Sequence, residues 1–142
     1  KQPWKCQEKV RYIMDTFYGN KPDALSGNDD CGQMSAWYIF NTMGFYPTAP
    51  SSNVYNLGSP GLAAVDMKMS NGKHLRMTTG NWSARNVFVK EVYLNGKKYD
   101  KSYITYNDIK DGADLHFVMS SRPNYKRGVA ERAVPPSVSE KR

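Results

Sequence analysis

The chain has 142 residues and a formal net charge of +7, with 39% apolar and 13% aromatic residues. This length fits one ordinary domain or pieces of larger ones, and the composition is that of a globular protein. The positive charge favours no nucleic-acid partner, because Lys and Arg are scattered and their densest cluster falls in the last residues. With no apolar run of about 18 residues, we also expect no membrane span.

The first predicted element is a helix over residues 4–18. Pro3 suits its first turn and Gly19 its end. Its apolar residues recur at i, i+3, i+4, i+7 and i+8 and so share one face: Val10, Ile13, Met14, Phe17 and Tyr18.

A polar, glycine-rich loop over residues 19–33 leads to a second predicted helix over residues 32–43. Gly44 ends this helix and Pro47 prevents its resumption. The helix is apolar on several sides, which predicts burial on several sides. Because two helices cannot cover one another completely, we expect its other neighbours to lie outside this chain.

Alternating apolar and polar residues predict strands after residue 50. Asn71-Gly72 and Asn95-Gly96 mark tight turns between strands. We expect five to seven antiparallel strands forming a small sandwich or half of one. The predicted segments are strands within 65–69, 74–77, 87–94, 102–106 and 115–119 and a helical turn at 107–109.

The resulting organisation is α+β with three segments. Residues 1–48 form a helical hairpin and residues 49–123 an antiparallel β region. Residues 124–142 carry charges and two adjacent prolines, and we expect a disordered or loosely docked tail. Cys6 and Cys31 could form one disulfide or could both be free, because two cysteines do not decide between these states.

Two adjacent carboxylates precede the second helix in GNDDCGQMSAWYIFNTMGFY, residues 27–46. One interpretation is that Asp30 caps the helix and Asp29 is solvated. Flanking glycines also permit close approach of a ligand, and such carboxylates could bind sugar hydroxyls, hold a hard cation or activate water. Gln33 and Ser35 would either cap the helix or support the base.

Several motifs in the same order resemble a known family. GNDDCGQMSAWYIFNTMGFYP resembles the segment G-[ND]-[DE]-D-x-G-[QS]-M-S-A-W-Y-x-x-x-x-x-G-F-Y-P of the calcium-dependent α-mannosidases of glycoside hydrolase family 92. The resemblance continues in QPWKCQEKVRYIMDTFY, YNLGSP, NGKHLRM and VYLNGKKYDKSYITYNDIKDGADLHFVMSSRPN, and it covers about residues 2–124.

This resemblance implies a fold and an activity. Family members have an N-terminal β-sandwich and an (α/α)6 barrel, are exo-acting, invert the anomeric centre and need Ca2+ to bind terminal mannose. The chain would then be a fragment of a larger enzyme, with the last barrel helices followed by a small β-sandwich-like region. The implied partners are mannose-containing glycans and the upstream part of the same enzyme, and the implied location is outside the cytoplasm.

The resemblance also implies roles for residues of the loop. Asp30 would be the general base, and Asp29 the second candidate for that role or for fixing the water. Asn28 stands at a position that is often acidic in the family; as an amide it could only form hydrogen bonds, so we assign Asn28 and Gln33 to substrate binding. No residue is assigned to Ca2+. The general acid would be an upstream Glu, since no match exists among Glu8, Glu91, Glu131 and Glu140.

We therefore expect the isolated chain to be inactive. The alternative function is a non-catalytic glycan-binding or structural β-module. Trp37 and Tyr38 have two possible roles: they line a sugar subsite, or they pack in a core. The mannosidic linkage is left open.

Overall fold

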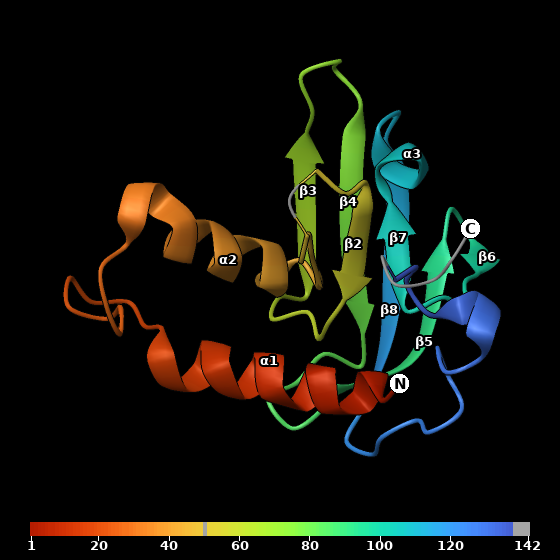
Figure 1. Cartoon of the computed structure of the whole chain (residues 1–142), viewed down its shortest axis with the longest axis horizontal. Coiled ribbons are helices and arrows are strands. Elements are labelled where there is room, and N and C mark those ends of the chain that lie inside the picture. Colours follow the sequence, from red (N-terminus) through yellow and green to blue (C-terminus); the bar gives the residue numbers. More distant parts are fainter. Residues whose placement is uncertain (50, 138–142) are drawn as a thin grey trace.

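The computed structural model describes residues 1–49 and 51–137. Within these residues the chain forms three α-helices and two β-sheets. In Figure 1, α1 runs along the lower side of the β region and α2 extends from it to the left. The helices are α1 Pro3–Phe17, α2 Gln33–Thr42 and α3 Tyr106–Ile109, with 3-10 turns η1 Asp30–Gly32 and η2 Glu131–Ala133. The strands are β1 Phe45–Tyr46, β2 Val54–Leu57, β3 Ala64–Lys68, β4 His74–Gly80, β5 Phe88–Leu94, β6 Lys97–Lys98, β7 Tyr103–Thr105 and β8 Ala113–Ser120.

Helix α1 confirms the first predicted helix, but its buried face differs from the apolar stripe. Its fully buried residues are Gln7, Arg11 and Met14, spaced so that they share one side. Phe17, from the predicted stripe, is 41% exposed. The side of α1 that meets the β region is therefore largely polar, and hydrophobic periodicity alone could not identify it.

Helix α2 confirms the second predicted helix. It ends where Gly44 adopts φ 90° and its N–H donates to the carbonyl of Asn41 at 2.9 Å. Asn41 and Thr42 are buried, whereas Tyr38 and Ile39 are 38% and 57% exposed. Within the described residues, one side of this apolar helix thus has no covering element.

Two sheets form the β region. The first has the order β1-β2-β7 and is antiparallel; the second has the order β3-β4-β8-β5-β6. The predicted hairpins are present, with Gly72 at φ 78° and Asn95 and Gly96 at φ 50° and 75° in their turns. Strands β1 and β2 were not predicted, because segments of two and four residues carry too little alternation to be recognised.

The expectation of an entirely antiparallel region is wrong for one pair of strands. β4 and β8 are parallel, in register from Leu75 opposite Ala113 to Gly80 opposite Val118. β5, β6, β7 and α3 intervene in the chain before β8 enters between β4 and β5. Turn residues report pairing between strands that follow each other directly, so they cannot reveal this crossover.

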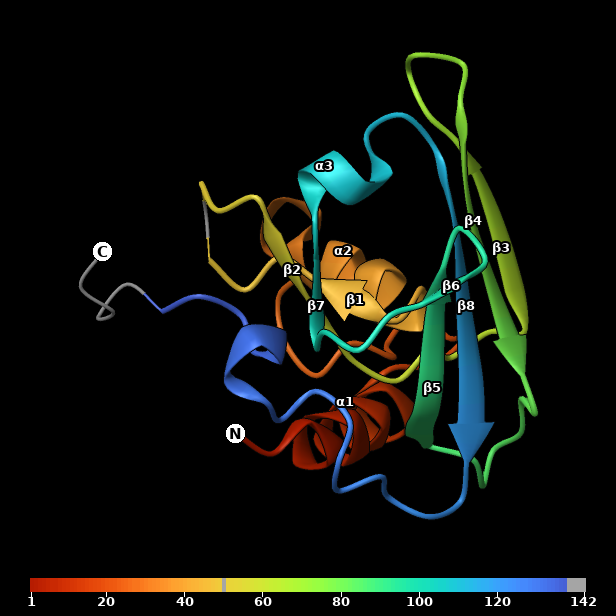
Figure 2. The same ribbon diagram turned by 90° about the vertical axis from the view of Figure 1, so that its right-hand side faces the viewer.

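The hydrophobic core lies between the two sheets, which form separate layers in Figure 2. Phe45, Leu57 and Ile104 contribute from the first sheet and are at most 3% exposed. The second sheet contributes Leu75, Met77, Val89, Val92, Leu115, Phe117 and Met119. This arrangement is the mixed α+β, sandwich-like structure that the sequence predicts, apart from the parallel pair.

Polar side chains of α1 connect the helical hairpin to the β region. Gln7 of α1 accepts a hydrogen bond from the N–H of Val89 at 3.0 Å. Arg11 donates to the hydroxyl of Ser59 at 3.4 Å and to the carbonyl of Pro60. The helical hairpin is therefore attached to the β region by hydrogen bonds that are buried.

The segment after Asn124 packs on the loop before β7. Arg127 is 8% exposed and donates to the carbonyl of Lys101 at 2.8 Å. Ser102 donates through its N–H and its hydroxyl to the carbonyl of Ala133 at 2.7 and 2.9 Å. This part of the expected tail is docked, whereas residues 138–142 lie outside the described residues.

Cys6 and Cys31 are both free, which resolves the two states that the sequence left open. The helices formed by residues 1–49 and 51–137 include none with the length and hydropathy of a bilayer span.

Candidate active site

The loop between α1 and α2 ends in a short turn with unusual backbone angles. Cys31 and Gly32 adopt φ 53° and 80°, in the left-handed region. The N–H of Gly32 donates to the carbonyl of Asp29 at 3.2 Å. Glycine adopts this conformation without cost, whereas Cys31 is held in it by the surrounding hydrogen bonds.

The carboxylate of Asp29 lies against the first turn of α2. Its Oδ1 accepts hydrogen bonds from the N–H groups of Met34 at 2.7 Å and Ser35 at 3.1 Å. Its Oδ2 accepts the hydroxyl of Ser35 at 2.5 Å. These bonds, those from Ser35 first, lower the pKa of the Asp29 carboxyl below its ordinary value.

Asp30 has the opposite environment. It is exposed, and its carboxylate has no hydrogen-bond or ion-pair partner among the residues that the structure describes. Only its main-chain carbonyl is engaged, by the N–H of Gln33. The interpretation in which Asp30 caps the helix and Asp29 is solvated is therefore wrong, because Asp29 performs the capping and Asp30 is free.

Asn28 and Gln33 lie at the same exposed end of the hairpin as Asp30. Neither side chain has a hydrogen-bond partner in the described part of the chain. All three side chains are thus available to a ligand. The sequence left open whether Gln33 and Ser35 cap the helix or support the base. Ser35 donates its hydroxyl to Asp29.

An aromatic cluster stands beside this turn, and its rings lie too far apart in the sequence for spacing to group them. The ring of Tyr18 stacks on Trp37 with centroids 5.4 Å apart and on Tyr38 with centroids 4.9 Å apart. Burial, the nearby carboxylate of Asp29 and Tyr46 raise the pKa of Tyr18. Trp37 and Tyr38 therefore pack on another aromatic ring, while Tyr38 remains 38% exposed.

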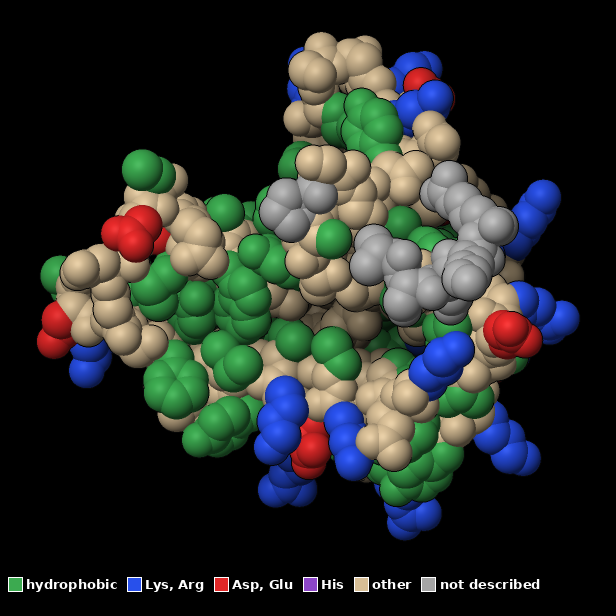
Figure 3. Space-filling model, in the orientation of Figure 1, with side chains coloured by type: hydrophobic (Ala, Val, Ile, Leu, Met, Phe, Trp, Pro, Cys, Tyr) green, Lys and Arg blue, Asp and Glu red, His purple; other side chains and the backbone are tan. Residues whose placement is uncertain are grey.

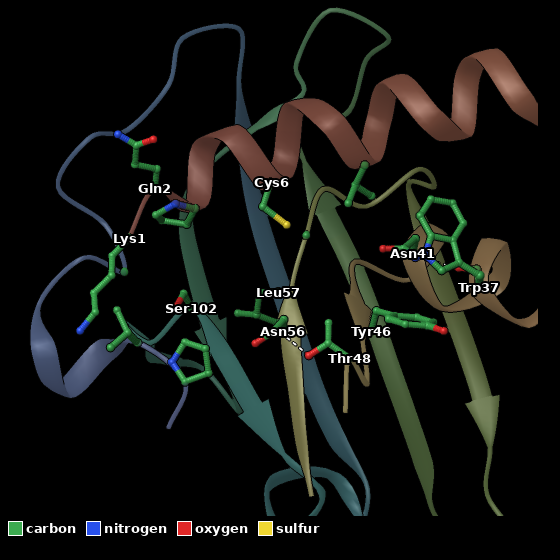
Figure 4. A pocket seen from close by; sticks show the side chains of 16 residues that line it. Lys1, Gln2, Cys6, Trp37, Asn41, Tyr46, Thr48, Asn56, Leu57 and Ser102 are labelled. Atoms are coloured by element: carbon green, nitrogen blue, oxygen red, sulfur yellow. Dashed lines mark hydrogen bonds between the residues drawn. The ribbon is translucent and has the colours of Figure 1, made fainter. Parts of the chain in front are cut away.

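A cavity of about 420 Å³ lies between the helical hairpin and the first sheet (Figure 4). Its lining is mostly apolar and includes Cys6, Val10, Trp37 and Tyr46. The residues that line this cavity include none of Asn28, Asp29, Asp30 and Gln33. The cavity therefore does not include the exposed end that carries Asp30.

The surface shows where further protein could pack. Figure 3 shows hydrophobic side chains gathered over α1 and α2, while Lys and Arg are spread along the lower and right-hand margins. The exposed apolar side chains of the hairpin are Tyr12, Phe17, Tyr38 and Ile39.

Residues 1–121 match the glycosyl hydrolase family 92 catalytic domain. The chain belongs to this family. The resemblance found in the sequence motifs is thereby confirmed.

Solved structures of family 92 contain the same fold. The α-mannosidase BT3965 from Bacteroides thetaiotaomicron is 67% identical with a TM-score of 0.94, over 97% of this chain and 19% of that protein. Another structure of BT3965 contains mannoimidazole and is 68% identical with a TM-score of 0.94, over 96% of this chain and 18% of that chain. The inverting mannosidase BT2199 from B. thetaiotaomicron VPI-5482 is 35% identical with a TM-score of 0.90, over 98% and 19% of the two chains.

A more distant relative is an uncharacterized secreted glycosidase from Arthroderma benhamiae. It is 29% identical over 140 residues, which is 96% of this chain and 18% of the relative. The chain thus spans about a fifth of the length of the family 92 proteins that it matches.

The resemblance to family 92 implies a bound calcium ion. Ca2+ takes six to eight oxygen ligands, with carboxylates prominent among them. The described residues contain no group of three or more His, Cys, Asp or Glu side chains that could hold a metal ion. We therefore assign no calcium ligand in this chain.

The carboxyl groups of glutamate do not supply an obvious acid either. Glu91 accepts hydrogen bonds from the hydroxyl of Tyr93 at 2.9 Å and from Lys98 at 3.4 Å, and these interactions lower its pKa. A general acid instead needs a raised pKa. Glu8 lies on α1, Glu131 lies in η2, and Glu140 is outside the described residues.

Proposed function

We propose that this chain is the C-terminal part of an inverting exo-α-mannosidase that requires Ca2+ and removes terminal α-linked mannose from glycans. Its membership of family 92 and its 67% identity to an α-mannosidase support this activity. The inverting outcome is supported by the mannosidase BT2199, which is described as inverting and is 35% identical. The secreted relative supports export of the enzyme.

The free carboxylate of Asp30 is the observation that carries the catalytic assignment. In an inverting glycosidase, a carboxylate removes a proton from water while the water oxygen bonds to the anomeric carbon. The bond to the leaving oxygen breaks at the same time, and a carboxylic acid protonates that oxygen. Asp30 can accept this proton because no described residue occupies its carboxylate.

Asn28 and Gln33 are the substrate-binding residues of the proposal. Both are exposed near Asp30, and their amides can donate to and accept from sugar hydroxyls. The general acid and most of the calcium ligands belong to the upstream part of the enzyme. For this reason, the isolated chain has no activity in the proposal.

The hairpin contributes its exposed apolar side to an (α/α)6 barrel. Ile39 and Tyr12 are 57% and 56% exposed on its two helices, and large apolar patches are uncommon on isolated proteins. Upstream helices would cover these side chains and complete the barrel. Residues 1–48 form the hairpin and residues 49–123 the closing β region in this proposal.

The test uses the full-length enzyme with an α-linked mannose disaccharide and Ca2+. Proton NMR at early times should show β-mannose, the product of inversion, and Asp30→Asn should lower kcat by about 10²–10⁴-fold. Wild-type turnover by folded Asp30→Asn enzyme would eliminate the general-base role. Glycan binding by the full-length enzyme without hydrolysis would instead favour the non-catalytic binding module.

A further inference from the structure

We propose that Asp29 is a positioning residue that holds the turn presenting Asp30 and does not itself accept the proton from water. This inference rests on the proposed function of Asp30. It divides the two adjacent carboxylates into one that reacts and one that fixes the other in place.

The first N–H groups of α2 show how Asp29 caps this helix. A helix leaves its first N–H groups without intrahelical partners. Gly32 occupies the N-cap position and has no side chain to accept them. The N–H of Gln33 reaches the carbonyl of Asp30, and those of Met34 and Ser35 both reach Oδ1 of Asp29. Asp29 therefore caps the helix across the intervening turn.

A turn of the backbone brings Asp29 to the start of the helix. Left-handed conformations at Cys31 and Gly32 reverse the chain, and the N–H of Gly32 bonds back to the carbonyl of Asp29. Both the main chain and the side chain of Asp29 are thus fixed to the start of α2. Asp30 lies between these attachments and remains exposed. Loss of the Asp29 carboxylate would release this turn.

The hydrogen bonds of Asp29 also oppose proton transfer to it. Oδ1 of Asp29 already accepts two hydrogen bonds and Oδ2 accepts the hydroxyl of Ser35 at 2.5 Å. One lone pair of Oδ2 is left for a further proton, but a proton there would remove the negative charge that strengthens these three bonds. The same bonds lower the pKa of Asp29 and make it a weaker base. Its chemistry suits a permanently ionised cap rather than a general base.

The test compares five variants of the full-length enzyme: Asp29→Asn, Asp29→Ala, Ser35→Ala, Asp30→Asn and the control Asp23→Asn. The control removes an exposed carboxylate from the same interhelical loop. Asp29→Asn keeps an oxygen for the N–H groups of Met34 and Ser35, so kcat should fall by less than about tenfold. Asp29→Ala removes the cap, and misplacement of Asp30 should lower kcat by up to about 10²-fold with a smaller change in KM.

The pH dependence separates positioning from proton transfer. In Asp29→Asn and Ser35→Ala, the decrease of kcat/KM toward acidic pH should persist, because the proposed base Asp30 is still present. Two results would overturn the inference. One is an Asp29→Asn enzyme that is as slow as Asp30→Asn and has lost the decrease of kcat/KM toward acidic pH. The other is an Asp29→Ala enzyme with wild-type kcat. If Asp29→Ala does not fold, Asp29→Asn and Ser35→Ala decide between these outcomes. Wild-type activity of Asp30→Asn would instead contradict the proposed function.

Discussion

The side-chain oxygen of Gln7 in α1 accepts the main-chain N–H of Val89 in β5 at 3.0 Å, between residues 82 positions apart. The partner strand β6 pairs with β5 only at Tyr93 and Leu94, so Val89 has no strand on that side. The helix supplies the acceptor that a neighbouring strand would otherwise provide. This bond attaches the hairpin that carries Asp29 and Asp30 to the β region.

Replacement of Gln7 by Leu should leave the buried N–H of Val89 without a partner. The expected cost is about 1–3 kcal/mol in the free energy of unfolding. Hydrogen–deuterium exchange of the full-length enzyme should show faster exchange in the peptide containing Val89. Glu8→Leu, at the exposed neighbouring position, is the matched control. Equal exchange in both variants would show that this bond contributes nothing.

Gly44 should be sensitive to replacement by Ala. A Cβ at this position would lie 3.0 Å from Cζ of Phe117 and 3.2 Å from Cβ of Pro60, with φ at 90°. Backbone strain of roughly 1–2 kcal/mol would add to overpacking of roughly 1–3 kcal/mol. Gly72→Ala has similar strain at φ 78° but no atom within 4 Å, so its midpoint of thermal unfolding should fall less. A smaller decrease for Gly44→Ala would contradict the packing argument.

The cap formed by Asp29 should make the start of α2 sensitive to acid. The pKa of Asp29 is lower in the folded state than its ordinary value, so the unfolded state binds the proton first. The stabilisation is therefore fully present above the ordinary pKa of about 4 and is lost as the pH falls through the lowered one. Asp29→Asn should flatten the decrease in thermal stability below about pH 4. An unchanged pH profile would argue against the cap.

Arg127 should hold the C-terminal segment on the β region. Burial lowers its pKa to about 10, which leaves it charged at neutral pH. Its Nη2 donates to the carbonyls of Lys101 at 2.8 Å and Tyr99 at 3.4 Å, and hydrogen bonds from charged groups contribute about 1.5–3 kcal/mol. Arg127→Ala should accelerate limited proteolysis after residue 124. The exposed Lys126→Ala should not, and equal rates for the two variants would refute this role.

The local elements could be predicted because their signals are local. Helices α1 and α2, the two hairpins and strand β8 follow from periodicity and turn residues within each segment. The parallel pairing of β4 with β8 could not be predicted, because it depends on which strand enters the sheet between β4 and β5. The polar contacts of Gln7 and Arg11 were missed for a related reason: their partners Val89 and Pro60 are distant in sequence.

At the site, two carboxylates before a helix and their family 92 motif can be recognised from the sequence alone. Which carboxylate caps that helix is visible only in the folded chain. The left-handed turn at Cys31 and Gly32 brings Asp29 onto the N–H groups of Met34 and Ser35 and leaves Asp30 free. Adjacent residues of the same type differ here because hydrogen-bond partners are fixed by the direction of the backbone, which composition and spacing do not specify.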